Sequence, residues 1–199
     1  MTDIDSTRPD STHPETRAVH AGREDFTALG IHAPPIDLST TYPVADLDAG
    51  TASFDALVGG DASAANPIYA RLHNPTVARV ERALATLEGT EACVAYASGM
   101  AAITALLLAS RARGAHMLVV RPLYGTSDHL FASGLAGLEA EFVAAHEIAA
   151  RRRPDTALIF IETPANPTLD LVDIRAVVEA AGDVPVAVDS TFATPILQR

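Results

Sequence analysis

The sequence contains no lysine, and it has fourteen arginines. It has one cysteine, Cys93, and few aromatic residues. The absence of lysine excludes a P-loop, because the motif GxxxxGK[ST] requires one. A single cysteine excludes a disulfide bond within the chain. The apolar run ACVAYA around Cys93 predicts a small buried thiol.

Long hydrophobic runs are missing as well. No stretch of about 18 apolar residues occurs, so we expect a globular, cytoplasmic protein without a membrane span. The N-terminus is polar and acidic, which is not the pattern of a secretory signal. The formal charge of −11 disfavours nucleic acid as a partner.

Several motifs that identify other functions are also absent. No GxGxxG follows the first expected strand, which counts against a dinucleotide-binding domain. No GxSxG is present, so the nucleophile elbow of the hydrolases has no support. The seven histidines and the cysteine show no spacing of metal ligands, and no metal site is expected.

The composition and the regularity of the sequence change near residue 65. Residues 1–65 are rich in Pro, Asp, Gly and Thr, and we interpret them as an extended N-terminal arm. The stretch HAPPIDLSTTYPV, residues 32–44, supports this because proline disfavours helix in the residue before it. Residues 66–199 are more regular and form the expected folded domain.

From Asn74 onward, helical and strand patterns alternate. Asn74 is a good helix cap, Pro75 suits the first helical position, and Gly89 is a stop signal, so a helix is predicted between them. Short apolar strands separated by helices predict an α/β fold with a mostly parallel sheet and flanking helices. The expected strands are 91–97, 116–120, 140–145, 157–162 and 184–189, and the further helices are 100–113, 127–132 and 173–182.

The residues that follow these strands suggest a ligand site, because ligands gather at the carboxyl ends of parallel strands. Ser98-Gly99-Met100 opens a long apolar helix, where glycine and free N–H groups suit a phosphate. Tyr124, the segment 163–167 and Asp189 follow three other strands. Each loop alone is compatible with an ordinary turn, but four loops place polar or aromatic groups on the same rim.

Five motifs occur in a recognisable order: PIYARLHNPT, YASGMAA, LYG, ETPANP and VDSTFATP. Together they resemble the pyridoxal 5′-phosphate enzymes of Cys/Met metabolism, the family of cystathionine γ-synthase, cystathionine γ-lyase and methionine γ-lyase. The resemblance runs from about residue 16 to residue 199. It implies the large domain of a fold type I pyridoxal-phosphate transferase, of which residues 66–199 would be the front part and therefore incomplete.

The resemblance also implies roles for particular residues. Gly99 and Met100 match the loop that holds the cofactor phosphate, and Tyr124 matches a tyrosine that stacks on the pyridine ring and moves protons. Asp189 matches the acid that pairs with the pyridinium nitrogen, and Asn166 lies near the ring hydroxyl. The implied catalytic residues are Tyr124 and Asp189, and the implied cofactor-binding residues are Tyr69, Arg71, Ser98, Gly99, Met100, Tyr124, Asn166 and Asp189.

Tyr69 and Arg71 match a pair that reaches the phosphate of a neighbouring subunit, so we expect a multimer with at least two copies of this chain. Family members hold the cofactor on a lysine, which this sequence lacks. We therefore expect a second polypeptide or a missing segment to supply the lysine and a C-terminal domain. This chain would be inactive by itself.

The implied activity is γ-elimination or γ-replacement on an amino-acid substrate such as cystathionine, methionine or an O-acylhomoserine. Thr126 and Ser190 depart from residues common in the family, and they leave the substrate open. A family member that performs only β-elimination or racemisation also stays open. Two further alternatives remain at this point. One is a non-catalytic binding or scaffold protein derived from the family, and the other is a nucleotide-binding oxidoreductase domain.

Overall fold

The structure is a computed structural model that describes residues 13–61 and 66–198. Its contacts divide the chain into two compact units, which meet in the sequence between Ala95 and Tyr96, and each unit is described by itself. The predicted division near residue 65, between an arm and a cofactor domain, stays a prediction. The first twelve residues of the arm, together with residues 62–65, lie outside the described residues.

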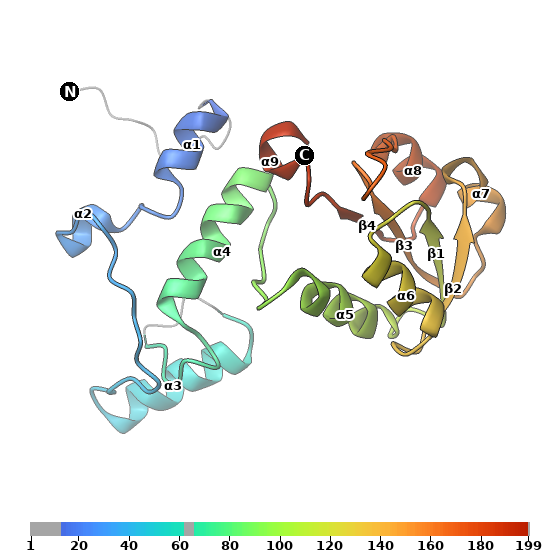
Figure 1. Ribbon diagram of the computed structural model, residues 1–199. Helices are drawn as coiled ribbons and strands as arrows, with labels where there is room; N and C mark the ends of the chain where they lie inside the picture. The colour runs from blue at the N-terminus through green and yellow to red at the C-terminus, as the bar shows by residue number, and fades with distance from the viewer. Residues whose placement is uncertain (1–12, 62–65, 199) are drawn as a thin grey trace. The chain divides into compact units, whose positions relative to one another are not determined.

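The N-terminal unit contains the predicted helix that follows Asn74 (Figure 1). The side-chain oxygen of Asn74 accepts hydrogen bonds from the amides of Thr76 and Val77 at 3.0 and 3.1 Å. Gly89 ends the helix with φ at 70°, a left-handed conformation that glycine adopts most easily. Both predicted ends are therefore confirmed. The helices of this unit are α1 (Pro14–His20), α2 (Phe26–Leu29), α3 (Leu47–Val58) and α4 (Pro75–Glu88).

The arm is only partly extended. The chain between α2 and α3 has no helix, as the prolines of residues 32–44 predict, and Thr41 forms an antiparallel bridge with Tyr69. However, α1, α2 and α3 all lie within the segment expected to be extended. Asp46 starts α3 by accepting the amide of Ala49 at 2.8 Å. The sequence pattern does not predict this helix, because its interior contains glycine, threonine and serine, which favour helix weakly.

The C-terminal unit is built on a four-stranded sheet of order β2-β1-β3-β4. All three neighbouring pairs are parallel, which confirms the predicted fold class. The central strands β1 and β3 are buried at every position, so they have continuous apolar runs rather than alternating patterns. The strands are β1 (His116–Val120), β2 (Glu139–Val143), β3 (Thr156–Glu162) and β4 (Val186–Asp189).

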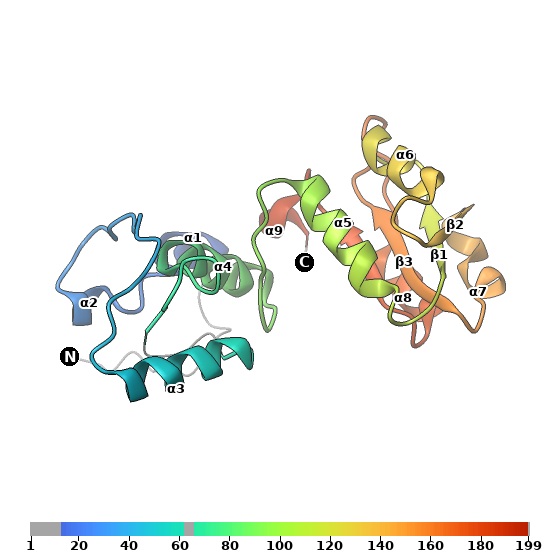
Figure 2. The same cartoon turned by 90° about the horizontal axis from the view of Figure 1, so that it is seen from below.

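Helices cover both faces of this sheet (Figures 1 and 2). On one face Phe131 of α6 packs in a cluster with Met117, and on the other Val177 of α8 packs in a cluster with Leu118. Adjacent residues of β1 therefore pack into the two hydrophobic cores on opposite faces of the sheet. The helices of this unit are α5 (Gly99–Ser110), α6 (Gly125–Ser133), η1 (Ala145–Glu147), α7 (Ile148–Arg151), α8 (Ile174–Ala181) and α9 (Thr194–Leu197). None of the helices in the described ranges is long and apolar enough to cross a membrane.

The strand predicted at residues 91–97 is wrong. This segment is not paired with any strand of the described residues, and Val94 and Tyr96 are 67% and 48% exposed. A strand needs a neighbour for its backbone hydrogen bonds, and an apolar run does not supply one. Cys93, expected to be buried, is partly buried.

Candidate functional site

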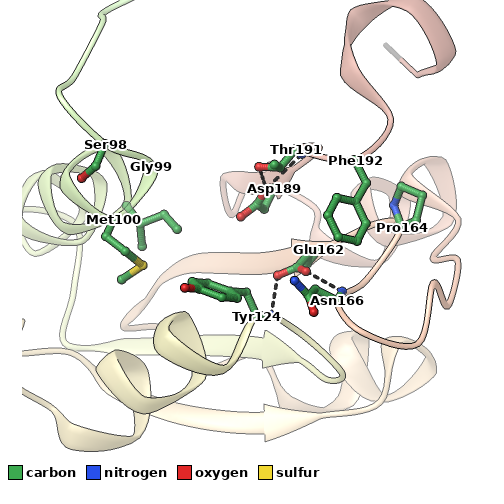
Figure 3. Close-up of a pocket in the computed structure, with 11 residues that line it drawn as sticks. Ser98, Gly99, Met100, Tyr124, Glu162, Pro164, Asn166, Asp189, Thr191 and Phe192 are labelled. Carbon is green, nitrogen blue, oxygen red and sulfur yellow. Dashed lines mark hydrogen bonds between the residues drawn. The ribbon is translucent and has the colours of Figure 1, made fainter.

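A pocket of about 330 Å³ lies at the carboxyl ends of the strands, within the C-terminal unit (Figure 3). Its walls come from the loops after β1, β3 and β4 and from the first turn of α5. This is the edge of a parallel sheet at which ligands are expected. The lining residues are Ser98, Gly99, Met100, Ile103, Tyr124, Glu162, Pro164, Asn166, Asp189, Thr191 and Phe192.

The start of α5 forms one wall of the pocket. Ser98 has an extended backbone, and its hydroxyl accepts the amide of Ala101 at 3.1 Å, which is a standard N-cap. The remaining amides of the first turn have no partner within the helix and carry the positive end of its dipole. A Cβ added to Gly99 would meet nothing within 4 Å. This wall therefore offers open backbone N–H groups to an anion.

Tyr124 presents its ring to the pocket from the loop between β1 and α6 (Figure 3). The residue is 43% exposed, so a flat ligand can reach the ring face. The loop is held by Arg121, whose guanidinium binds both carboxylate oxygens of Asp128 at 2.6 and 3.0 Å. Arg121 also lies 3.6 Å from the centre of the Phe142 ring. Hydrogen bonding to Asp128 raises the pKa of Arg121, so the guanidinium stays charged.

Glu162, the last residue of β3, joins two of the loops. Its carboxylate accepts the amide of Tyr124 at 2.7 Å with one oxygen and the amide of Asn166 at 2.7 Å with the other. The residue is only 5% exposed. Sequence reasoning did not include Glu162 among the site residues, although one signal was available. It is a charged residue at the end of an otherwise apolar buried strand.

Asp189 stands at the end of β4, in register with Glu162 of β3. One of its carboxylate oxygens, Oδ1, accepts both the amide and the hydroxyl of Thr191, at 3.1 and 2.6 Å. Figure 3 shows Asp189 and Tyr124 on opposite sides of the same space, with Ser98 and Met100 on a third side. The pocket therefore combines a helix start, an aromatic face and an oriented carboxylate.

These groups suit a phosphorylated aromatic ring that carries a protonated nitrogen. The α5 start would accept the phosphate, the Tyr124 ring would contact the flat face, and the carboxylate of Asp189 would stabilise a ring cation. Pyridoxal phosphate has all three features, so the residues present fit it.

Comparison with known proteins agrees with this chemistry. The family described as Cys/Met metabolism PLP-dependent enzyme matches residues 15–199. The chain belongs to this family. Pyridoxal phosphate is the cofactor that the family implies.

Individual members show the same likeness. The chain is 55% identical to an L-methionine gamma-lyase of Streptomyces avermitilis over 187 residues, which cover 93% of this chain and 45% of the relative. It is 36% identical to an O-succinylhomoserine sulfhydrylase of Pseudomonas aeruginosa over 192 residues, 93% of this chain and 46% of the relative. The crystal structure of metB from Corynebacterium glutamicum matches with a TM-score of 0.77 at 30% identity, covering 94% of this chain and 47% of that one. The chain thus spans about half the length of the relatives it matches.

The structure brings together most of the site residues expected from the sequence of this family member. Tyr69 and Arg71 belong to the N-terminal unit, where the Arg71 guanidinium lies 5.4 Å from the centre of the Tyr69 ring. Their part in cofactor binding stays a prediction. The expected residues that line the pocket are Ser98, Gly99, Met100, Tyr124, Asn166 and Asp189.

Proposed function

We propose that this chain forms part of a pyridoxal-phosphate-dependent lyase that removes the γ-substituent of a sulfur amino acid, with methionine as the first candidate substrate. The observation that carries the proposal is the pocket, in which a helix start, Tyr124 and Asp189 converge within a chain of this family. Methionine ranks first because the relative at 55% identity is named L-methionine gamma-lyase. γ-Replacement on an O-acylhomoserine is the second candidate, supported by the sulfhydrylase at 36% identity.

Different residues of the pocket hold different parts of the cofactor. The first turn of α5, at Gly99 and Met100, binds the phosphate, and Tyr124 packs against the ring. The carboxylate of Asp189 keeps the ring nitrogen protonated, because an adjacent negative charge favours the charged form. The side chain of Asn166, which lines the pocket, would hold the ring hydroxyl. When bound, pyridoxal phosphate withdraws electrons from the α-carbon of an amino-acid substrate.

Tyr124 is the candidate proton carrier of this chain. A γ-elimination requires protons to leave the α- and β-carbons and one to reach the departing sulfur. The Tyr124 hydroxyl belongs to an exposed ring in the pocket wall, so it can reach a bound substrate. A primary amine is also needed to hold the cofactor, and the sequence has no lysine. We place that amine on a further segment or a partner chain.

Assembly is the other part of the proposal. Tyr69 and Arg71 would serve the phosphate of a neighbouring subunit, because an arginine fork matches phosphate geometry. The active form then contains at least two copies of this chain. A non-catalytic scaffold has no physical need of an oriented Asp189 or an accessible Tyr124 ring, which is why we prefer an enzyme.

The test is product analysis with the purified protein and every chain that copurifies with it, identified by mass. Methionine, cystathionine and O-succinylhomoserine are supplied separately with cofactor, and release of a thiol or a new thioether is measured. Asp189→Ala should abolish turnover, while Glu179→Gln, an exposed acid on α8, should not change it. Turnover that survives Asp189→Ala, or wild-type protein that binds cofactor but converts none of the substrates, would count against the proposal.

A further inference from the structure

Glu162 has an unusual position for a carboxylate. It ends a strand that is buried throughout, it is 5% exposed, and it forms no ion pair within the described residues. Both of its oxygens instead accept backbone amides, each at 2.7 Å. Removing a carboxylate from water is costly unless hydrogen bonds replace the lost hydration. Two short bonds to a charged acceptor supply that replacement.

The two amides belong to different loops. The amide of Tyr124 lies 38 positions before Glu162, after β1, and the amide of Asn166 lies four positions after it. Both residues line the pocket with their side chains (Figure 3). An amide fixed at 2.7 Å fixes the Cα beside it, and the Cα sets the direction in which the side chain leaves the backbone. One carboxylate thus sets the spacing between the Tyr124 ring and the Asn166 side chain.

We propose that Glu162 is the positioning residue that holds Tyr124 and Asn166 at their working separation in this pocket. It is not itself a proton carrier, because both of its oxygens are already used by backbone amides. The role rests on the proposed function for its effect on catalysis. Its effect on the two loops is independent of the proposed function, because the hydrogen bonds are made by the protein alone.

The substitution that tests this is Glu162→Gln. Glutamine has nearly the same size, but only one of its two terminal atoms is an acceptor. Its NH₂ group would face one of the amides, donor against donor, so one loop must release its bond. Glu162→Asp provides a second variant, which keeps the charge but is one methylene shorter and cannot reach both amides. Glu179→Gln makes the same chemical change on the exposed surface of α8 and is the matched control.

The first measurement is amide hydrogen exchange on the purified protein without cofactor or substrate. In Glu162→Gln, exchange of the peptide that contains Tyr124 or of the peptide that contains Asn166, whichever loop releases its bond, should rise roughly tenfold or more, since a bond to a charged acceptor is lost. Peptides of β1 and of α8 should keep wild-type exchange. A uniform rise across the whole sheet, or no rise near either residue, would overturn the proposal.

The second measurement is steady-state kinetics on the loaded enzyme. A displaced Tyr124 should lower kcat roughly tenfold or more while KM changes by about twofold or less, because orientation affects the reaction more than binding. A kcat that falls only in proportion to the folded fraction would indicate a structural role and overturn the proposal. If Glu162→Gln does not fold, Glu162→Asp is judged by the same two measurements. If the wild type turns over no substrate, the exchange result still decides the role of Glu162, and only the proposed function fails.

Discussion

Thr191 donates both its backbone amide and its hydroxyl to a single oxygen of Asp189, at 3.1 and 2.6 Å. This pair of bonds fixes the carboxylate in one orientation at the end of β4. Within the described residues, the other oxygen, Oδ2, has no hydrogen-bond donor, so it is the oxygen that a ligand can use. Thr191, although exposed itself, therefore orients Asp189 as the proposed binding of a ring cation requires.

Thr191→Val should weaken cofactor binding roughly tenfold or more, because a hydrogen bond to a charged group contributes about 1.5–3 kcal/mol. Valine keeps the shape of threonine and the backbone bond, but it removes the hydroxyl that lies 2.6 Å from Asp189. The measurement is titration of the purified protein with pyridoxal phosphate, followed by absorbance. Thr191→Ser retains the hydroxyl and should bind as the wild type does. Equal affinities for the valine and serine variants would show that the hydroxyl does not orient Asp189.

Much of the fold was accessible from the sequence because its signals are local. Asn74 and Gly89 mark the ends of α4, and the apolar runs of β1 and β3 indicate strands buried on both faces. The segment 91–97 has the same apolar character but is not paired with a strand of the described residues. Pairing depends on a partner elsewhere in the chain, which a local pattern does not contain.

The same difference between local signals and distant contacts applies to the site residues. Tyr124 and Asp189 were predicted because each follows an expected strand, and strand ends meet at one edge of a parallel sheet. Gly99 was predicted on the same ground, but the strand expected before it is absent, and it lines the pocket as the first residue of α5. Glu162 was missed because its role lies in a contact across 38 positions, with the amide of Tyr124. Sequence shows that a charge is present at the strand end. Only the fold shows that its two oxygens bind two separate loops.

Asp25→Asn should release the segment between α1 and α2 from α4. Arg79 binds both carboxylate oxygens of Asp25, at 2.6 and 2.8 Å, and also the carbonyl of Gly22 at 2.6 Å. Its guanidinium lies 5.3 Å from the centre of the Phe26 ring. Limited proteolysis should therefore cut the segment between α1 and α2 faster in the variant. Asp48→Asn, an exposed acid on α3, is the control, and equal cleavage of the two variants would contradict the prediction.

The same contact should depend on pH. The hydrogen bond from Arg79 holds the pKa of Asp25 below its ordinary value of 3.8. A lowered pKa means that the contact is fully formed above pH 3.8 and is lost as the pH falls through the lower folded value. Proteolysis of wild-type protein between α1 and α2, with an acid-active protease, should accelerate only below that pH. Acceleration near neutral pH would indicate another titrating group.

Cys93 should react slowly with alkylating reagents. Burial, followed by the negative charges of Glu81 and Glu88, raises the pKa of its thiol above the ordinary value of 9.0. The thiolate is the reactive form, so iodoacetamide should label Cys93 more slowly than it labels glutathione at about pH 7.5. Glu88→Gln removes one of the charges and should speed the labelling, whereas Glu179→Gln should not. Labelling of Cys93 is followed by peptide mass spectrometry, and a wild-type rate equal to that of glutathione would refute the prediction.

Arg71→Ala and Asp189→Ala should each inactivate the enzyme, yet a mixture of the two variants should recover activity. The proposed site combines Asp189 of one subunit with Arg71 of its neighbour. In a mixed dimer, one site then contains both substitutions and the other contains neither. Random exchange of subunits makes half of the dimers mixed, so about a quarter of wild-type activity is expected from a two-fold symmetric pair. The two variants, each together with the segment or partner chain that supplies the lysine, are unfolded together, refolded with cofactor and assayed. Each variant refolded in the same way without the other is the control. If Arg71 served the site of its own chain, every site in the mixed dimer would be damaged and the mixture would stay inactive.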